Sequence, residues 1–457
     1  MIGSVRLAEV AAAINAKHRG TNVPFQSVST DTRTIQSGDL FVALVGDRFD
    51  GHEYLQEAAD KGASAVMISR EVESPVPYLQ VKDTLTGLAD LAKFNRDRFQ
   101  HPLVAVTGSS GKTTVKEMVA HVLRSKAGAS EVLATRGNFN NHIGAPLTLL
   151  RLTQQHHYAV IELGASAEGE IAYTAKLAQP SVSILTNADA AHLEGFGDID
   201  TVARTKGEII DHLVDGGTAI LNADSKYFSQ WVERAEGAGK KVISFGLNNQ
   251  ADVHARNVQS DEHGCHSFEA VTPKGNFEFK LSIMGKHNVT NALTATATCL
   301  ALDISPEVVA KALENFFGVK GRLAVQKGTN DSTIIDDSYN ANPASVRAAI
   351  DALATHAGTR IFVLGDMAEL GADTQRAHAE MGAYAREAGI DAFYGLGEFS
   401  RSAVDAFGDN GHWFATHETL VRFLTKNLNT EVTALVKGSR SANMDRVVAD
   451  ITISNKD

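Results

Sequence analysis

Cysteine is scarce in this sequence of 457 residues, which contains only Cys265 and Cys299. Two thiols are too few for a disulfide scaffold or a cysteine-based zinc site. No apolar run approaches the roughly 18 residues of a membrane-spanning helix. The first helical pattern carries Arg6 and Glu9 among its apolar residues, so the beginning of the chain does not read as a signal peptide. These absences predict a soluble, cytoplasmic protein with reduced thiols and no membrane span.

Basic residues are outnumbered, because 43 lysines and arginines face 54 aspartates and glutamates, for a net charge of −11. A general nucleic-acid binder is more often basic, so nucleic acid is not an expected partner. The sequence also lacks a long-period repeat, a low-complexity segment and a G-x-G-x-x-G after a predicted strand, so a dinucleotide site is not indicated. The length predicts two to four domains.

The rest of the chain is organised around residues 101–114, which read HPLVAVTGSSGKTT. Residues 103–106 are a continuous apolar run, as expected for a parallel strand covered on both faces. After the glycine turn, apolar residues recur at the spacing of one helix face, at Val115, Met118, Val119, Val122 and Leu123. The pattern therefore predicts a strand, a tight turn and a helix, in that order.

This turn predicts a nucleoside triphosphate site. Gly108 and Gly111 allow the backbone to approach a phosphate, and the helix N-terminus presents N–H groups to it. Lys112 adds a charge that can reach the β- and γ-phosphates, and Thr113 offers a hydroxyl to Mg²⁺. The turn is shorter than the common P-loop, which has its first glycine where this chain has Val106. The alternative, a glycine and serine turn before an ordinary amphipathic helix, is disfavoured because strand, turn, lysine and helix follow in the right order.

Two further apolar segments, residues 158–164 and 181–187, predict strands of a doubly wound α/β sheet. Glu162 lies near the end of the first, and His192 lies in the loop after the second. Ligands of open α/β sheets bind at the carboxyl ends of the strands, so both side chains can converge on the P-loop. A capping glutamate and a surface histidine are the simpler interpretations of each alone. Beside a P-loop, metal ligation is favoured.

Lys206 interrupts an apolar helix stripe formed by Ile199, Val202, Ile209 and Leu213. One interpretation is snorkelling, in which the aliphatic stem is buried and the ammonium reaches water. The other is a functional amine near the site, with a lowered pKa or a covalent modification. The stripe alone favours snorkelling.

The flanking regions also alternate between helix and strand patterns. Residues 30–33 could hold a phosphate or a uracil edge, and a solvated turn is an equally good interpretation. Residues 252–283 read as short alternating strands, which predict a small β insertion. Residues 318–322 read as a hinge, and strands are expected beyond it at 333–337, 361–366 and 433–438.

Several blocks of the sequence together resemble the Mur ligase family. They are DTR (31–33) with GDLF (38–41), the P-loop (107–114), GNFNN (137–141) with IGAPLT (143–148), ELGA (162–165), GKHNVTN (285–291), DDSYNANP (336–343), LGDMAELG (364–371) and VKGSRS (436–441). The P-loop is shared with folylpolyglutamate synthases, whereas residues 337–343 and 364–371 are typical of the members that add D-alanyl-D-alanine. Leu163 stands where methionine is expected, a conservative apolar exchange.

The resemblance implies a three-domain α/β ligase. Its parts would be a smaller N-terminal α/β domain (1–82) for the UDP-substrate, a central doubly wound P-loop ATPase domain (83–317), and a C-terminal Rossmann-like α/β domain (318–457) for the dipeptide. It implies a monomer that uses ATP to join D-alanyl-D-alanine to UDP-N-acetylmuramoyl-tripeptide through an acyl phosphate, for peptidoglycan synthesis. The third residue of the tripeptide, diaminopimelate or lysine, is left open.

The resemblance also implies roles for individual residues. Lys112, His192 and Lys206 would be catalytic, and the metal site, for two Mg²⁺ ions, would comprise Thr113, Glu162, His192 and Lys206. ATP would contact Thr107, Gly108, Ser109, Ser110, Gly111, Lys112, Thr113, Thr114, Asn288, Asn291, Arg322 and Asp337. The other substrates would contact Thr30, Asp31, Arg33, Asn138, Asn140, Asn141, Tyr339, Asn340, Asn342, Lys437, Ser439 and Arg440. Lys206 matches a lysine that is carbamylated in several Mur ligases, which favours its functional interpretation over snorkelling.

Four alternatives compete with this interpretation. A ligase that adds the third peptide residue and a folylpolyglutamate synthase share the family, but the synthase should lack the N-terminal domain. A P-loop small-molecule kinase would have no use for the C-terminal domain. A non-catalytic nucleotide-binding module is disfavoured by the presence of Lys112, Thr113, Glu162 and His192 together.

Overall fold

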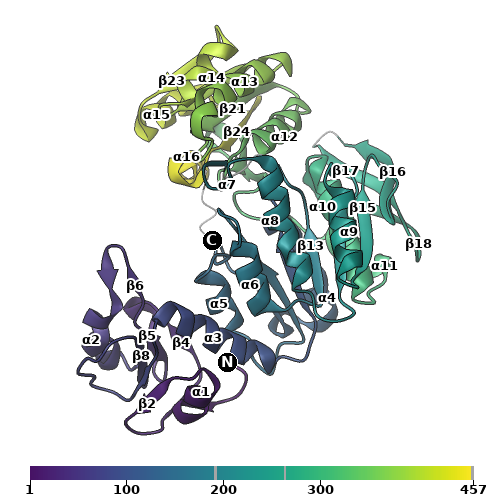
Figure 1. Cartoon of the computed structure of the whole chain (residues 1–457). Coiled ribbons are helices and arrows are strands. Elements are labelled where there is room, and N and C mark those ends of the chain that lie inside the picture. Colours follow the sequence, from purple (N-terminus) through teal and green to yellow (C-terminus); the bar gives the residue numbers. More distant parts are fainter. Residues whose placement is uncertain (190–192, 262–263, 454–457) are drawn as a thin grey trace.

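The computed structural model describes residues 1–189, 193–261 and 264–453, and three sheets of five or more strands dominate it (Figure 1). Each sheet is formed by one region of the sequence and is covered by helices from that region. Within the described residues, no helix is both long and apolar enough to cross a membrane.

The N-terminal sheet has the strand order β2-β9-β8-β5-β4. Its strands are β2 (Lys17–Arg19), β4 (Val28–Ser29), β5 (Leu40–Val42), β8 (Ala65–Ile68) and β9 (Tyr78–Gln80). Two short ribbons accompany it, β1 (Val5–Arg6) with β3 (Pro24–Phe25) and β6 (Val45–Gly46) with β7 (Phe49–Asp50). The helices of this region are α1 (Leu7–Ala13) and α2 (Leu55–Asp60), and α3 (Thr84–Asp97) follows as the link to the central region. The core of this sheet continues through α3 into the central region, because Leu40, Leu88 and Leu103 belong to one apolar cluster.

The central sheet has nine strands in the order β11-β12-β10-β13-β14-β15-β16-β17-β18. They are β10 (Leu103–Thr107), β11 (Val132–Ala134), β12 (Tyr158–Glu162), β13 (Val182–Leu185), β14 (Thr218–Asn222), β15 (Lys241–Gly246), β16 (Val253–Ser260), β17 (Cys265–Thr272) and β18 (Gly275–Met284). The helices are α4 (Lys112–Ala127), α5 (Gly144–Leu149), α6 (Glu170–Ala178), α7 (Leu193–Phe196), α8 (Ile199–Asp211), α9 (Phe228–Gly237), α10 (His287–Ala301) and α11 (Pro306–Glu314).

The P-loop strand β10 is covered on both faces, as its apolar run predicts. Leu103 and Ala105 belong to the cluster that contains residues of α6 and α8, whereas Val104 and Val106 belong to the cluster that contains residues of α4 and α10. The prediction of a doubly wound sheet is therefore confirmed.

The strands predicted for a small β insertion at residues 252–283 are present. β16 pairs in parallel with β15, and β17 and β18 continue the same sheet in antiparallel fashion. Phe268 and Phe279 stack on one another and join the core beneath α10, so these strands extend the central domain.

The C-terminal sheet has the order β19-β20-β24-β21-β22-β23. Its strands are β19 (Ala324–Lys327), β20 (Thr333–Asp337), β21 (Thr359–Gly365), β22 (Ala392–Leu396), β23 (Gly411–Phe414) and β24 (Val432–Lys437). Its helices are α12 (Pro343–Ala354), α13 (Thr374–Glu387), α14 (Ser400–Phe407), α15 (His417–Asn427) and α16 (Met444–Ile451). The helices cover both faces, because Ile335 packs in the cluster of α12 and α13 and Ile334 in the cluster of α15 and α16.

Candidate active site

A cavity of about 630 Å³ lies between the carboxyl edges of the central and C-terminal sheets. The central sheet contributes residues that follow β10 and β13 and the last residue of β12, Glu162. The C-terminal sheet contributes Asp337 and Lys437, which end β20 and β24 and lie opposite each other in the parallel register. The volume is in the range of small-molecule sites, and the position is the one expected for ligands of parallel sheets.

The P-loop is folded tightly against the strand beside it. Gly108 has a φ of +145°, and a Cβ atom there would lie 1.9 Å from Oγ1 of Thr186. Gly111 has a φ of +79° and immediately precedes α4. Only glycine fits both positions, which leaves the backbone and the N-terminus of α4 facing the cavity.

Lys112 and Glu162 supply opposite charges on the central side of the cavity. The Lys112 ammonium donates to the carbonyl of Gly108 at 2.6 Å, within its own loop. Burial lowers its pKa, and the nearby Glu162 carboxylate opposes this shift. Glu162 is buried, and its Oε1 accepts a hydrogen bond of 2.9 Å from the Asn140 amide. Its Oε2 is buried and has no hydrogen-bond partner among the residues that the structure describes, so this oxygen is available to a cation.

The C-terminal side of the cavity is rich in cations. Lys437 forms a buried ion pair with Asp337 and also donates to the carbonyl of Asn340 at 2.9 Å. Burial lowers the pKa of Lys437, and Asp337 opposes that shift. The guanidinium of Arg322 lies 4.4 Å from the ring centre of Tyr339, and that of Arg440 lies 5.9 Å from it. This side can therefore attract anionic groups.

One hydrogen bond joins the two sides directly. The amide of Asn342, the residue that caps α12, donates to Oγ of Ser110 in the P-loop at 3.2 Å. The same side chain accepts from the backbone N–H of Ser345 and forms a capping box. The N-terminus of α12 is thereby held against the P-loop.

Lys206 lies behind the cavity wall. It is buried on α8, and its ammonium donates to the carbonyl of Ala165 at 3.2 Å and lies 5.3 Å from the ring centre of Phe196. Burial, with repulsion from Lys112, lowers its pKa to about 7. The snorkelling interpretation is wrong, because the amine points to a buried carbonyl.

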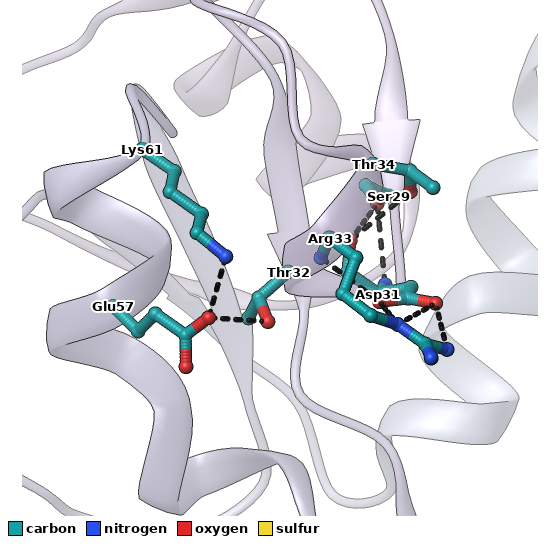
Figure 2. A network of polar contacts seen from close by, with 7 residues as sticks. All are labelled: Ser29, Asp31, Thr32, Arg33, Thr34, Glu57 and Lys61. Atoms are coloured by element: carbon teal, nitrogen blue, oxygen red, sulfur yellow. Dashed lines mark hydrogen bonds and ion pairs between the residues drawn. The ribbon is translucent and has the colours of Figure 1, made fainter.

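Two of the predicted N-terminal site residues, Asp31 and Arg33, belong to a polar network of their own (Figure 2). Arg33 makes a two-pronged ion pair with Asp31, with contacts of 2.9 and 2.6 Å, and holds the pKa of that carboxyl down to about 2. Thr32 donates to Glu57, which Lys61 also binds. The loop is thus an ordered structure on the surface of the N-terminal region, separate from the cavity.

The cavity brings together most of the predicted site residues. Its lining includes Ser109, Ser110, Gly111, Lys112, Thr113, Thr114, Asn138, Asn140, Asn141, Glu162, Asn288, Asn291, Arg322, Asp337, Tyr339, Asn340, Asn342, Lys437 and Arg440. Thr107, Gly108, Lys206 and Ser439 lie behind this lining, and Thr30, Asp31 and Arg33 lie in the N-terminal region. His192 lies outside the described residues, and within them no group of three His, Cys, Asp or Glu side chains is placed to hold a metal ion.

Sequence reasoning missed several residues around the cavity. His287 and Asp189 line it, and burial lowers the pKa of the first and raises that of the second. Lys116, one helical turn after Lys112, is buried against Glu162. Its only sequence signal is the spacing of four residues from the P-loop lysine.

Comparison with known domains gives three matches in chain order. The Mur ligase family catalytic domain matches residues 24–96, the Mur ligase middle domain matches 106–299, and the Mur ligase glutamate ligase domain matches 321–440. Together they span all three sheets.

Full-length relatives agree with these matches. The chain is 41% identical to the UDP-N-acetylmuramoyl-tripeptide–D-alanyl-D-alanine ligase of Escherichia coli, over 97% of this chain and 98% of that protein, and 34% identical to the Bacillus subtilis ligase of the same name, over 97% of each. Its fold matches the crystal structure of MurF from Acinetobacter baumannii with a TM-score of 0.91 and 34% identity, over 98% of this chain and 99% of that one. It matches MurF from Thermotoga maritima in complex with ADP with a TM-score of 0.82 and 28% identity, over 93% and 96%. The chain belongs to the Mur ligase family.

Proposed function

We propose that this chain is an ATP-dependent ligase that joins D-alanyl-D-alanine to UDP-N-acetylmuramoyl-tripeptide and releases ADP and phosphate. The observation that carries the proposal is the shared cavity, in which a P-loop faces a cationic C-terminal wall. A kinase needs only the P-loop, whereas a ligase also needs a second wall that holds the amine-bearing substrate. The names of the full-length relatives support the same choice of substrates.

The reaction divides into two displacements. The terminal carboxylate of the tripeptide attacks the γ-phosphorus of ATP, the bond from that phosphorus to the bridging oxygen breaks, and ADP leaves. The amine of D-alanyl-D-alanine then attacks the acyl carbon, loses a proton, and expels phosphate. Lys112 and the N-terminus of α4 would neutralise the phosphoryl oxygens during the first step. An acyl phosphate hydrolyses readily. The contact between α12 and the P-loop would protect this intermediate by excluding water from the cavity.

Magnesium fits the donors on the central side. Glu162 offers a buried carboxylate oxygen that no described residue hydrogen-bonds, and the hydroxyl-bearing Thr113 lines the same cavity. Oxygen ligands of this kind suit Mg²⁺, which would offset phosphate charge as the γ-phosphoryl moves. We assign Thr113 and Glu162 to this site, with His192 as a further ligand and two ions in all.

We further propose a carbamate on Lys206. A pKa of about 7 leaves a substantial fraction of the amine neutral, and the neutral amine is the form that adds CO₂ and loses a proton. The resulting negative charge would be costly in a buried position without a cation beside it, which the second Mg²⁺ would provide.

The remaining assignments follow the sheets. Residues 1–82 would bind the UDP-substrate through Thr30, Asp31 and Arg33, residues 83–317 would bind ATP, and residues 318–457 would bind the dipeptide. Adenine would meet Asn291, and Arg322 with Asp337 would contact the ribose and phosphates.

Phosphate release tests the proposal. The enzyme is supplied with ATP and each UDP-tripeptide, carrying diaminopimelate or lysine, and with D-alanyl-D-alanine, diaminopimelate, lysine or glutamate as the amine. We expect release only with a tripeptide and the dipeptide together, with a product of the corresponding mass. Release with a single amino acid, or without any amine, would contradict the proposed ligase activity.

A further inference from the structure

Glu162 is held from one side only. Asn140 donates to Oε1 at 2.9 Å, while Oε2 is buried and lacks a hydrogen-bond partner within residues 1–189, 193–261 and 264–453. An unpartnered carboxylate oxygen away from water is costly unless a positive charge lies nearby. The ammonium of Lys116 lies 3.7 Å from Oε2, and the Lys116 side chain is only 1% exposed.

Lys116 is fixed by partners other than Glu162. It donates to the carbonyl of Thr135 at 2.7 Å and lies 3.1 Å from the carboxylate of Glu117. Thr135 in turn accepts the backbone N–H of Glu162 on its Oγ1 at 2.9 Å. Lys116 therefore ties the first turns of α4 to the ends of β11 and β12.

Lys116 thus supplies a positive charge near Glu162 without donating a hydrogen bond to its Oε2. At 3.7 Å the ammonium is within ion-pair range of Oε2 but beyond a hydrogen bond, so the lone pairs of Oε2 are not engaged. A lysine that reached Oε2 at 2.8 Å would instead compete with a metal ion for the same oxygen. Lys116 also lies one helical turn from Lys112 and Thr113 on α4.

We propose that Lys116 is a positioning residue for divalent metal binding. It places a positive charge beside the Glu162 carboxylate and holds that end of β12 in position, and it leaves Oε2 free for the ion that accompanies the nucleotide. The inference rests on the proposed function, because it takes Glu162 to be a ligand of that ion.

The test compares metal binding in Lys116→Met with that in wild type. Mn²⁺ binding in the presence of ADP is measured by the loss of the free-ion signal in electron paramagnetic resonance, and ADP binding without metal is measured by calorimetry. We expect the Mn²⁺ dissociation constant to rise at least tenfold in Lys116→Met, with metal-free ADP affinity changed less than twofold. Lys116→Arg, which keeps the charge, should recover most of the loss. Lys126→Met is the matched control, because Lys126 is an exposed lysine on the same helix.

A double-mutant cycle tests whether Lys116 affects metal binding through Glu162. In a Glu162→Gln background, Lys116→Met should change Mn²⁺ affinity less than twofold, because the carboxylate through which it acts is gone. In turnover assays the Mg²⁺ concentration for half-maximal rate should rise more than kcat falls. If Lys116→Met does not fold, Lys116→Gln, which keeps an N–H donor for Thr135, takes its place with the same expectations.

Two outcomes would overturn the inference. Unchanged Mn²⁺ affinity would make Lys116 a packing residue, and tighter binding would show that its charge only repels the metal. Both are distinguishable from failure of the proposed function, in which wild-type protein itself releases no phosphate with the tripeptide and dipeptide.

Discussion

The lysines beside the cavity differ in what surrounds each amine. Lys112 faces the cavity from the first turn of α4, whereas Lys206 is enclosed behind the wall by Ala165 and Phe196. Burial lowers the pKa of both amines; Glu162 opposes this shift at Lys112, and Glu170 and Glu208 oppose it at Lys206. The position of Lys112 on the cavity therefore suits contact with phosphate, whereas the enclosure of Lys206 suits chemistry of a neutral amine.

Replacement of Lys112 with alanine tests the first role. We expect turnover to fall by a factor of about 10² to 10³, the scale of one lost electrostatic stabiliser. Folding should change little, because within the described residues the ammonium donates only to carbonyls of its own loop. Phosphate release and thermal unfolding measure the two effects, and near-normal release would remove Lys112 from the phosphate site.

Replacement of Lys206 with alanine tests the second role. We expect the variant to be nearly inactive, because a negative group beside the metal would be lost. Acetate or formate should restore part of the activity by occupying the vacated carboxylate position. Intact mass measurement under CO₂ checks the modification directly. A fully active wild-type enzyme with an unmodified Lys206 would refute the carbamate.

At the scale of elements, Asn342 has two roles at the start of α12. Its side chain caps the helix, and its amide contacts Ser110 across the cavity. Asn342→Ala should cost about 0.5–2 kcal/mol of stability through the lost cap. Asn342→Asp keeps a cap acceptor for Ser345 but loses the amide donor to Ser110, so it should unfold near the wild-type temperature yet release phosphate at least several-fold more slowly.

A matched cap elsewhere controls for stability. Thr416→Ala removes the cap of α15, in which the Thr416 side chain accepts a hydrogen bond from the backbone N–H of Thr419. Thr416 belongs to the same C-terminal region but is not among the residues that line the cavity. It should lower the unfolding temperature and leave turnover unchanged. Equal turnover in Asn342→Asp and wild type would mean that the contact with Ser110 has no catalytic consequence.

The sequence predicted those elements whose signal is local. The strand and helix around the P-loop are confirmed because apolar spacing and glycine positions determine them within about 25 residues. The place of β16–β18 in the central sheet was not predicted. The alternation of apolar and polar residues indicates a strand, but it does not indicate that the strand pairs with β15. Lys116 was missed for a similar reason: a lysine on an amphipathic helix reads as exposed until Thr135 and Glu162 are brought to it.

At the scale of the whole molecule, the cavity needs two regions to be close together. Gly318 and Gly321 have positive φ angles of 92° and 75° and flank the segment that leads to Arg322. We predict that an ATP analogue with the UDP-substrate lowers the radius of gyration in solution scattering, because both ligands favour the conformation in which Asn342 reaches Ser110. Lys112→Ala should show less compaction at the same ligand concentrations. An unchanged radius at saturation would count against a closing C-terminal domain.

The place of β10 in the middle of the central sheet also has a consequence for synthesis of the chain. Thr107 at its end bonds to Leu163, 56 residues later, and to Thr186, 79 residues later. A growing chain therefore releases the P-loop strand well before either neighbouring strand exists. Such long-range pairing slows folding and leaves apolar strand edges uncovered meanwhile. The P-loop strand therefore needs protection from aggregation while the ribosome completes the central sheet.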